Sequence, residues 1–241
     1  MEKIKTITKN LVPQETCMQP QTKTTQILSE QDETNKIIDF QECVEFLNKK
    51  GREIFGKSFL VHPEDYEVIF KILVYTIKDE KNARKHKIDL NKGILLSGPI
   101  GCGKTSLMRL INFVNPKNDK YMIKSCREVG YEFISQGYQV LHNYSYQSFK
   151  TVENIKVPKV WCFDDLGTEN NLKYYGNECN LMAEILLSRY DLFVQKDMLT
   201  HLTTNLTAQE IENLYGNRVR SRMREMFNLI SFDAGSKDKR V

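Results

Sequence analysis

The sequence contains no hydrophobic run long enough to span a membrane and no secretion signal. Its longest apolar stretch, residues 69–77, is interrupted by Lys71, whereas a membrane-spanning helix requires about 20 apolar residues. The first ten residues, MEKIKTITKN, lack the apolar run of about 7 to 15 residues that a signal peptide requires. We therefore expect a cytoplasmic protein with no membrane partner.

Cysteine pairs and a strong excess of one charge are also missing. The six cysteines are scattered and none forms a C-x-x-C pair, which excludes a disulfide framework and a cysteine-based zinc site and predicts reduced thiols. Lysine and arginine total 35 against 31 acidic residues. The resulting net charge of +4 permits an anionic partner without requiring one.

Composition divides the 241 residues into three segments. Residues 1–36 contain nine apolar residues and no aromatic ones, too few to offset the entropy of ordering, so they predict a disordered polar arm. Residues 37–85 predict an N-terminal helical segment, with one helix at positions 40–55 and another after Pro63. Residues 86–241 form the third segment.

The third segment predicts a parallel sheet enclosed by helices. Residues 94–96 are an apolar run too short for a helix, and residues 105–114 carry apolar side chains at helical spacing. Further strands are expected at 121–123, 160–163, 199–203 and 229–232, and further helices at 127–134 and 179–194. Because strands and helices alternate, the fold class is α/β.

A phosphate-binding loop joins the first of these strands to its helix. The sequence from Gly98 to Thr105 matches G-x-x-x-x-G-K-[ST] in full. Backbone N–H groups and the helix N-terminus would point at phosphate, Lys104 would reach the terminal phosphates, and Thr105 would ligate Mg²⁺. The residues expected to bind ATP are Gly98, Pro99, Ile100, Gly101, Cys102, Gly103, Lys104, Thr105 and Ser106. Cys102 is interpreted as a small filler, with a redox switch as the alternative.

Two adjacent carboxylates follow the predicted strand at 160–163. In P-loop enzymes one such carboxylate holds the metal and another orients the attacking water. We assign Asp164 to Mg²⁺ and Asp165 to water. A kinase would use its acidic residue on a phosphoryl acceptor, so the pair by itself does not distinguish hydrolysis from transfer.

Polar residues also end the strand predicted at 199–203. Because parallel strands present their C-terminal ends to the ligand, Asn205 would face the same crevice and bond the γ-phosphate or its attacking water. The alternative is an Asn205 that merely caps a helix starting at Thr207.

Four alternating arginines follow: Arg218, Arg220, Arg222 and Arg224. In a helix, Arg218 and Arg222 would share one face and Arg220 and Arg224 another, so one pair could serve phosphate chemistry while the other stays solvated. A fully solvated basic face is the alternative.

The order of phosphate loop, Asp-Asp-Leu-Gly, Thr-Thr-Asn-Leu and Arg-Val-x-x-Arg-Met-Arg resembles the DnaC/IstB family of AAA+ ATPases over residues 90–233. The resemblance implies a five-stranded AAA+ core at about 86–241 with a reduced C-terminal lid, ATP with Mg²⁺ as cofactors, and work on DNA, with single strands favoured. It also implies a homo-oligomer in which Arg222 is the arginine finger and Asn205 is sensor 1.

The chain departs from the family pattern at both ends. The second sensor is left open among Lys237, Lys239 and Arg240, because the Phe-x-x-x-Ser-Tyr-Arg pattern of helicase loaders is not present. No zinc-ligand cluster or recognisable helicase-binding domain precedes the core, which leaves open whether the protein partner is a replicative helicase or a transposase.

An aromatic segment at 131–150 has two interpretations. Its side chains could stack on unpaired bases, at about 1–3 kcal/mol for each base, or could pack a helix between two strands. Packing is favoured.

The leading hypothesis is an ATP-hydrolysing helicase loader acting on DNA. The alternative within the family is a transposition helper ATPase that activates a transposase. A P-loop small-molecule kinase is disfavoured because it needs neither an intersubunit arginine nor a sensor asparagine. A nucleotide-bound scaffold that does not hydrolyse ATP is a further alternative.

Overall fold

The computed structural model describes residues 4–6, 36–169, 172–174 and 177–240. The polar arm expected over residues 1–36 lies outside this part of the chain, apart from Lys36 and strand β1 (Ile4–Thr6), which pairs antiparallel with β2 (Lys36–Ile38). No helix among the described residues combines the length and apolar character needed to cross a bilayer.

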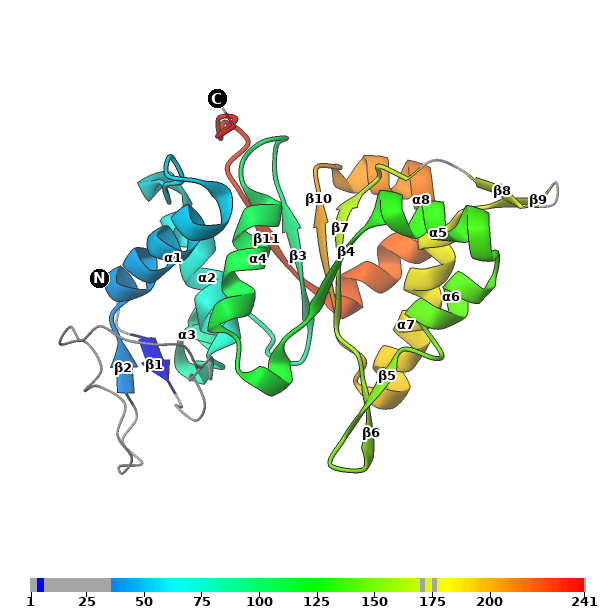
Figure 1. Cartoon of the computed structure of the whole chain (residues 1–241), viewed down its shortest axis with the longest axis horizontal. Helices are drawn as coiled ribbons and strands as arrows, with labels where there is room; N and C mark the ends of the chain where they lie inside the picture. The colour runs from blue at the N-terminus through cyan, green and yellow to red at the C-terminus, as the bar shows by residue number, and fades with distance from the viewer. Residues whose placement is uncertain (1–3, 7–35, 170–171, 175–176, 241) are drawn as a thin grey trace, which may run out of the picture.

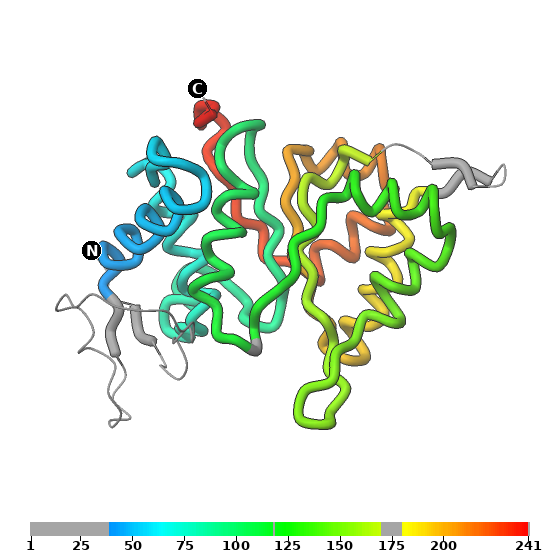
Figure 2. Tube along the Cα trace, in the orientation of Figure 1, coloured from blue at the N-terminus to red at the C-terminus, as the bar shows by residue number. Residues whose placement is uncertain are grey.

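A five-stranded parallel sheet forms the centre of the molecule, as the sequence predicted (Figure 1). Its spatial order is β11-β3-β10-β7-β4, so β11 lies beside β3 although it comes last in the chain (Figure 2). The strands are β3 (Gly93–Ser97), β4 (Met122–Ser125), β7 (Trp161–Leu166), β10 (Thr200–Thr204) and β11 (Phe227–Ser231).

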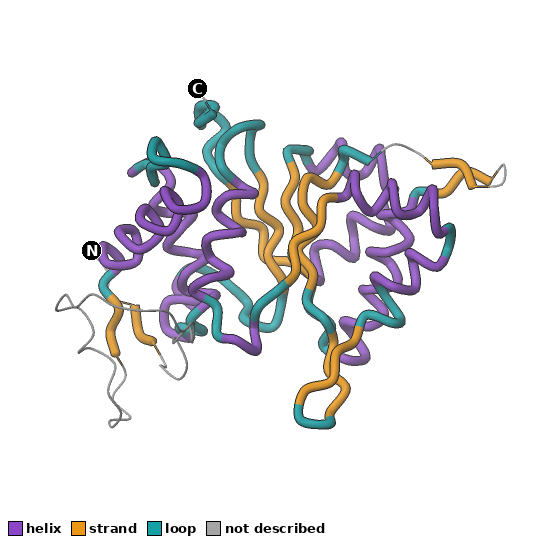
Figure 3. Tube along the Cα trace, viewed as in Figure 1, coloured by secondary structure: helices purple, strands orange, loops and turns teal. Residues whose placement is uncertain are grey.

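Helices cover both faces of the sheet (Figure 3). One face carries α1 (Phe40–Phe55), α2 (Tyr66–Thr76), α3 (Glu80–Lys85) and α4 (Lys104–Val114). The other carries α5 (Cys126–Gln136), α6 (Gln139–Tyr144), α7 (Leu181–Lys196) and α8 (Ala208–Met226). Short 3₁₀ turns occupy Pro63–Asp65 and Lys117–Asp119.

Central strand β3 is buried on both faces, which explains its continuous apolar run. Leu95 packs into the core under α5 to α8, whereas Ile94 and Leu96 pack into the core under α1, α2 and α4. A strand buried on both faces needs apolar side chains at every position rather than at alternate ones. The core under α1, α2 and α4 packs α1 and α2 directly onto the sheet. The domain boundary expected between residues 85 and 86 stays a prediction.

Several elements differ from the sequence expectation. Strand β7 continues to Leu166, so both Asp164 and Asp165 lie inside it rather than after it. Helix α3 is a third helix within residues 37–85, where the sequence indicated only two. Asp79 caps this helix by accepting a bond from the backbone N–H of Asn82.

The aromatic segment also holds more structure than the sequence indicated. It contains α6, and a hairpin of β5 (Phe149–Val152) with β6 (Ile155–Pro158) begins at its C-terminal end. A second hairpin, β8 (Leu172–Tyr174) with β9 (Asn177–Cys179), precedes α7. Short elements of this kind lack the periodicity that identifies longer ones.

Arg189 on α7 is fully buried and joins the helical layer to the sheet. It donates hydrogen bonds to Thr200 Oγ1 (2.7 Å) and to the carbonyls of Tyr144 (2.7 Å), Leu199 (2.8 Å) and Lys159 (3.2 Å). Burial lowers its pKa to about 9. The guanidinium therefore satisfies backbone oxygens near the N-terminal ends of β7 and β10.

Candidate nucleotide-binding site

The phosphate loop runs from the end of β3 to the start of α4. Gly101 and Gly103 have φ of 80° and 99°, values that L side chains rarely adopt, and Gly103 precedes the first residue of the helix. The loop therefore turns tightly into the N-terminus of α4, and the N–H groups of a first helical turn form the kind of site that binds anions.

Lys104 is buried and bonds within the loop. Its Nζ donates to the carbonyl oxygens of Gly98 at 2.8 Å and Pro99 at 2.7 Å. The ammonium group thus lies inside the curve of the loop. Cys102 is also buried, and burial raises the pKa of its thiol, which keeps the thiol protonated and favours the filler interpretation over a redox switch.

Thr105 and Asp164, the expected metal ligands, lie side by side. Thr105 Oγ1 donates to Asp164 Oδ1 at 2.9 Å, and Thr203 Oγ1 donates to the same oxygen at 2.6 Å. Burial raises the pKa of Asp164, and the hydrogen bonds from Thr203 and Thr105 oppose that shift. One carboxylate and one hydroxyl are hard oxygen donors of the kind that fits Mg²⁺, which takes most of its ligands from water and phosphate.

A bulge in β7 aims the two carboxylates differently. Leu202 pairs with Phe163 and Thr204 with Leu166, so Asp164 and Asp165 together face Thr203 alone. Asp165 has a φ of 56°, an uncommon value for a non-glycine residue, and its N–H donates to Thr203 Oγ1 at 2.9 Å. Asp165 consequently lines the same cavity as the phosphate loop.

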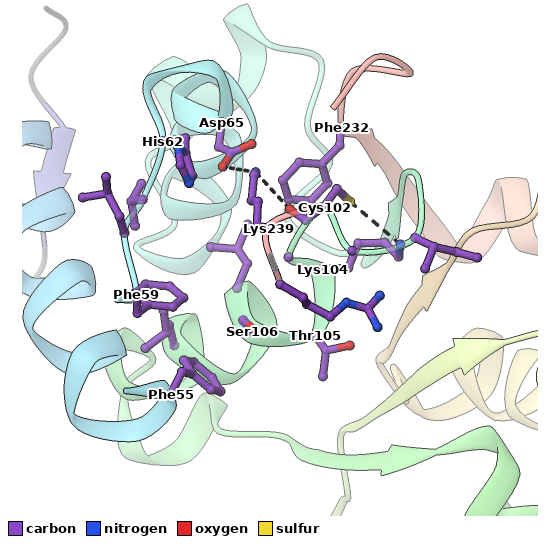
Figure 4. A pocket seen from close by; sticks show the side chains of 18 of the residues that line it. Phe55, Phe59, His62, Asp65, Cys102, Lys104, Thr105, Ser106, Phe232 and Lys239 are labelled. Atoms are coloured by element: carbon purple, nitrogen blue, oxygen red, sulfur yellow. Dashed lines mark hydrogen bonds and ion pairs between the residues drawn. The ribbon is translucent and has the colours of Figure 1, made fainter. Parts of the chain in front are cut away.

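That cavity, of about 710 Å³, is lined by four parts of the chain (Figure 4). The phosphate loop and the start of α4 form one wall, and Asp165, Thr168 and Asn205 lie at the ends of the neighbouring strands. The other walls come from residues 55–69 and from the C-terminal residues Phe232, Lys239 and Arg240. The sequence predicted the phosphate loop, Asp165 and Asn205, and it missed Thr168, Phe232 and residues 55–69.

Asn205 lies where the sequence placed it, at the end of β10 facing the cavity. The alternative, that it caps the next helix, is wrong. Thr207 is the cap of α8: its side chain accepts from the backbone of Glu210, and the Glu210 side chain accepts from the backbone of Thr207.

Arg222 does not line the cavity of its own chain. Its guanidinium lies over the ring of Tyr190, 4.2 Å from the ring centre, and Nη1 donates to the Tyr190 hydroxyl at 2.9 Å. Helix α8 kinks at Gly216, where φ is 85°, and all four arginines, Arg218 to Arg224, lie in the part of the helix after the kink. Arg220 pairs with Glu212 on the same helix.

Two of the three candidates for a second sensor, Lys239 and Arg240, line the cavity, whereas Lys237 does not. Lys239 Nζ pairs with Asp65 Oδ2 and donates to the carbonyl of Cys102 at 3.0 Å. Asp65 was not predicted, since no local pattern relates residues 174 positions apart.

The aromatic segment divides into buried and exposed side chains. Phe133 and Tyr144 are buried, and the Tyr144 hydroxyl donates to Glu132 at 2.7 Å, so Tyr144 is a packing residue and is not available to stack on bases. Tyr131, Tyr138 and Tyr146 are exposed. Packing is thus correct for part of the segment.

No protein-family model and no curated protein sequence matches the chain. Solved structures similar to it include the DnaC helicase loader, at 17% identity and a TM-score of 0.46, covering 72% of this chain and 92% of that one. DnaI has 18% identity and a TM-score of 0.45, covering 73% and 88%. AMPPCP-bound DnaA from Aquifex aeolicus has 18% identity and a TM-score of 0.44, covering 75% and 50%. The described residues form an α/β fold with a five-stranded parallel sheet and a phosphate-binding loop between β3 and α4. DnaC, whose family the motifs resemble, is among the solved structures to which the chain is similar.

Proposed function

We propose that this protein is a Mg²⁺-dependent ATPase that remodels DNA complexes as a replicative-helicase loader. The hydrogen bond between Thr105 and Asp164 carries the nucleotide part of this proposal, because it brings the phosphate loop and the acidic strand together at one cavity. Hydroxyl, carboxylate and lysine side chains converge there as phosphoryl chemistry requires.

Each residue has a distinct task in this proposal. The loop N–H groups and Lys104 bind the phosphates, and Thr105 with Asp164 would hold Mg²⁺, which when bound neutralises phosphate oxygens. The Asp165 carboxylate accepts a proton from the attacking water and orients it toward the γ-phosphate. Asn205 donates its side-chain amide to that phosphate or to the water, from the same side of the cavity.

Nucleotide binding and turnover assays test these roles. Lys104→Ala should bind ATP weakly, whereas Asp165→Asn should retain binding and lose turnover, because only the first removes charge from the phosphate subsite. Phosphate release without an added acceptor separates an ATPase from a small-molecule kinase and from a scaffold. Tight ATP binding by Lys104→Ala would refute the site assignment.

The family resemblance and the exposed groups support the DNA and protein partners in this proposal. Arg218, Arg224, Tyr131 and Tyr146 are exposed, and such residues bind phosphate and stack on unpaired bases. Fluorescence anisotropy with a single-stranded oligonucleotide should show tighter binding with ATP than with ADP, and Tyr131→Ala should weaken it. Equal anisotropy in both nucleotides would contradict DNA remodelling.

The identity of the protein partner distinguishes a helicase loader from a transposition helper. Affinity capture from the native host with ATP present should recover a ring helicase. Recovery of a transposase instead would favour the transposition helper, which shares the same order of motifs.

A further inference from the structure

The C-terminal tail runs beside the phosphate loop and bonds to it. The backbone N–H of Lys239 donates to the carbonyl of Gly101 at 3.0 Å, and Lys239 Nζ donates to that of Cys102 at 3.0 Å. A Cβ atom placed on Gly101 would lie 2.1–2.5 Å from the carboxyl atoms of Asp238. The tail and the loop are therefore in direct contact, and a side chain at position 101 would have to displace that of Asp238.

The same lysine reaches a second wall of the cavity. Its Nζ pairs with Oδ2 of Asp65, the residue that ends the 3₁₀ turn before α2, and lies 4.0 Å from Glu64 (Figure 4). The side chains of Lys239 and Asp65 are 16% and 8% exposed. The ion pair is thus largely shielded from water, where it is screened less than a surface pair.

Asp65 depends on this lysine. Its other oxygen, Oδ1, is buried and has no hydrogen-bond partner among the described residues. Removing the ammonium group would leave a buried carboxylate without its cation, which is far more costly than losing an exposed pair. The segment that carries Asp65 would then have to move to hydrate the carboxylate.

Lys239 therefore connects three walls of one cavity. Asp65 belongs to the wall of residues 55–69, Lys239 to the C-terminal wall, and Cys102 to the phosphate loop. Because its Nζ is occupied by Asp65 and a loop carbonyl, Lys239 is directed away from the phosphate subsite that Lys104 serves.

We propose that Lys239 and Asp65 form a clasp that holds these walls around bound nucleotide and so sets how long the nucleotide remains bound. Lys239 is a positioning residue in this arrangement: it keeps Phe232 and Arg240 against the cavity. The inference rests on the proposed nucleotide site and adds the control of nucleotide release to it.

The experiment is a stopped-flow chase of the fluorescent analogue mant-ATP, with Mg²⁺, from the full chain. Lys239→Ala should release the analogue faster by a factor of about 5 to 150, the usual range for coupling between two sites. Lys239→Arg keeps the charge and should stay close to wild type. The matched control is Lys237→Ala, which removes the same charge from an exposed tail residue outside the cavity lining and should leave release unchanged.

A double-mutant cycle separates a clasp from independent structural effects. Asp65→Asn should also accelerate release, and the double variant Asp65→Asn with Lys239→Ala should release no faster than the quicker single variant, because both remove the same interaction. Thermal melting without nucleotide verifies that each variant is folded. If Lys239→Ala does not fold, the two single variants Asp65→Asn and Lys239→Arg still test the clasp.

Three results would overturn the clasp. Lys239→Ala could release mant-ATP at the wild-type rate, or Lys237→Ala could accelerate release as much as Lys239→Ala does. In the third, the double variant would accelerate release by the product of the factors of the two single variants. A wild-type protein that does not bind mant-ATP would contradict the nucleotide site itself, which is a different outcome from unchanged release.

Discussion

His201 is a buried titratable residue in the centre of the sheet. Its Nδ1 accepts a hydrogen bond from the backbone N–H of Ile94 at 3.0 Å, and its ring lies against Tyr75 and Tyr121. Burial lowers the pKa of His201 to about 3. The imidazole is therefore neutral in the folded protein, and protonating it would remove the acceptor that Ile94 uses.

This burial predicts a loss of stability in mild acid. In the unfolded chain the pKa of a histidine is about 6.5, so between pH 6.5 and 3 the unfolded state binds a proton that the folded state does not. The contribution of His201 to the free energy of unfolding is fully present above about pH 6.5. Below that pH the free energy of unfolding falls by at most about 1.4 kcal/mol per pH unit. Urea unfolding between pH 8 and 5 measures this slope.

His201→Asn provides the comparison, because asparagine keeps an acceptor near the Nδ1 position and does not titrate. Its unfolding free energy should fall less steeply than that of the wild type. Equal slopes in the two proteins would assign the acid sensitivity to other groups.

Thr203 orients both acidic residues of the site. Thr203→Val removes the hydroxyl that bonds to Asp164 and to the N–H of Asp165 while keeping the shape of the side chain. Mutating a residue that hydrogen-bonds to a metal ligand typically lowers metal affinity or activity by about 10- to 100-fold. ATP turnover and its activation by Mg²⁺ should therefore fall by that factor. Thr203→Ser should restore most of the activity. Full turnover by Thr203→Val would show that the bulge alone positions the carboxylates.

At the scale of elements, Arg189 determines how α7 meets the sheet. Arg189→Met removes the donor to three backbone carbonyls, one buried and two partly buried. A buried polar group left without a partner costs about 1–3 kcal/mol, so the unfolding free energy should fall by about 3 kcal/mol. The control is Arg224→Met on the exposed side of α8, which should change stability by less than about 0.5 kcal/mol. Urea unfolding compares them, and similar losses would contradict the role of Arg189.

Helices with strong periodicity could be predicted to within a few residues, whereas the bend in β7 could not. Helix α1 and the helix after the phosphate loop repeat apolar side chains at helical spacing and begin at recognisable signals. The bulge at Asp164 and Asp165 is a register shift between β7 and β10, whereas β7 pairs regularly with β4, so it depends on the neighbouring strand and not on the residues of β7 alone.

At the scale of the whole molecule, the position of Arg222 away from its own cavity supports action on a neighbouring subunit. Specific ATPase activity should then rise with protein concentration, and Arg222→Ala should reduce it, since arginine fingers are worth about 10³ to 10⁵ in rate. Mixing Arg222→Ala with Lys104→Ala should restore some turnover, because one variant supplies the finger and the other an intact cavity.

Analytical ultracentrifugation provides the control by showing that the two variants assemble together. A mixture that assembles and stays inactive would show that Arg222 has no role in trans. The basic face would then be interpreted as solvated, with Arg222 held by Tyr190 and Glu225.

The sequence by itself determined the α/β class, the phosphate loop, the paired carboxylates and the place of Asn205 at a strand end. Each of these depends on residues that are neighbours in the chain, where spacing and residue type are sufficient. Only the tertiary structure decided that Thr203 bridges the carboxylates, that Tyr144 and Arg189 are buried, and that Lys239 meets Asp65. These contacts join segments brought together by the order of the strands and the packing of helices on them, and no local periodicity encodes which distant side chains will meet.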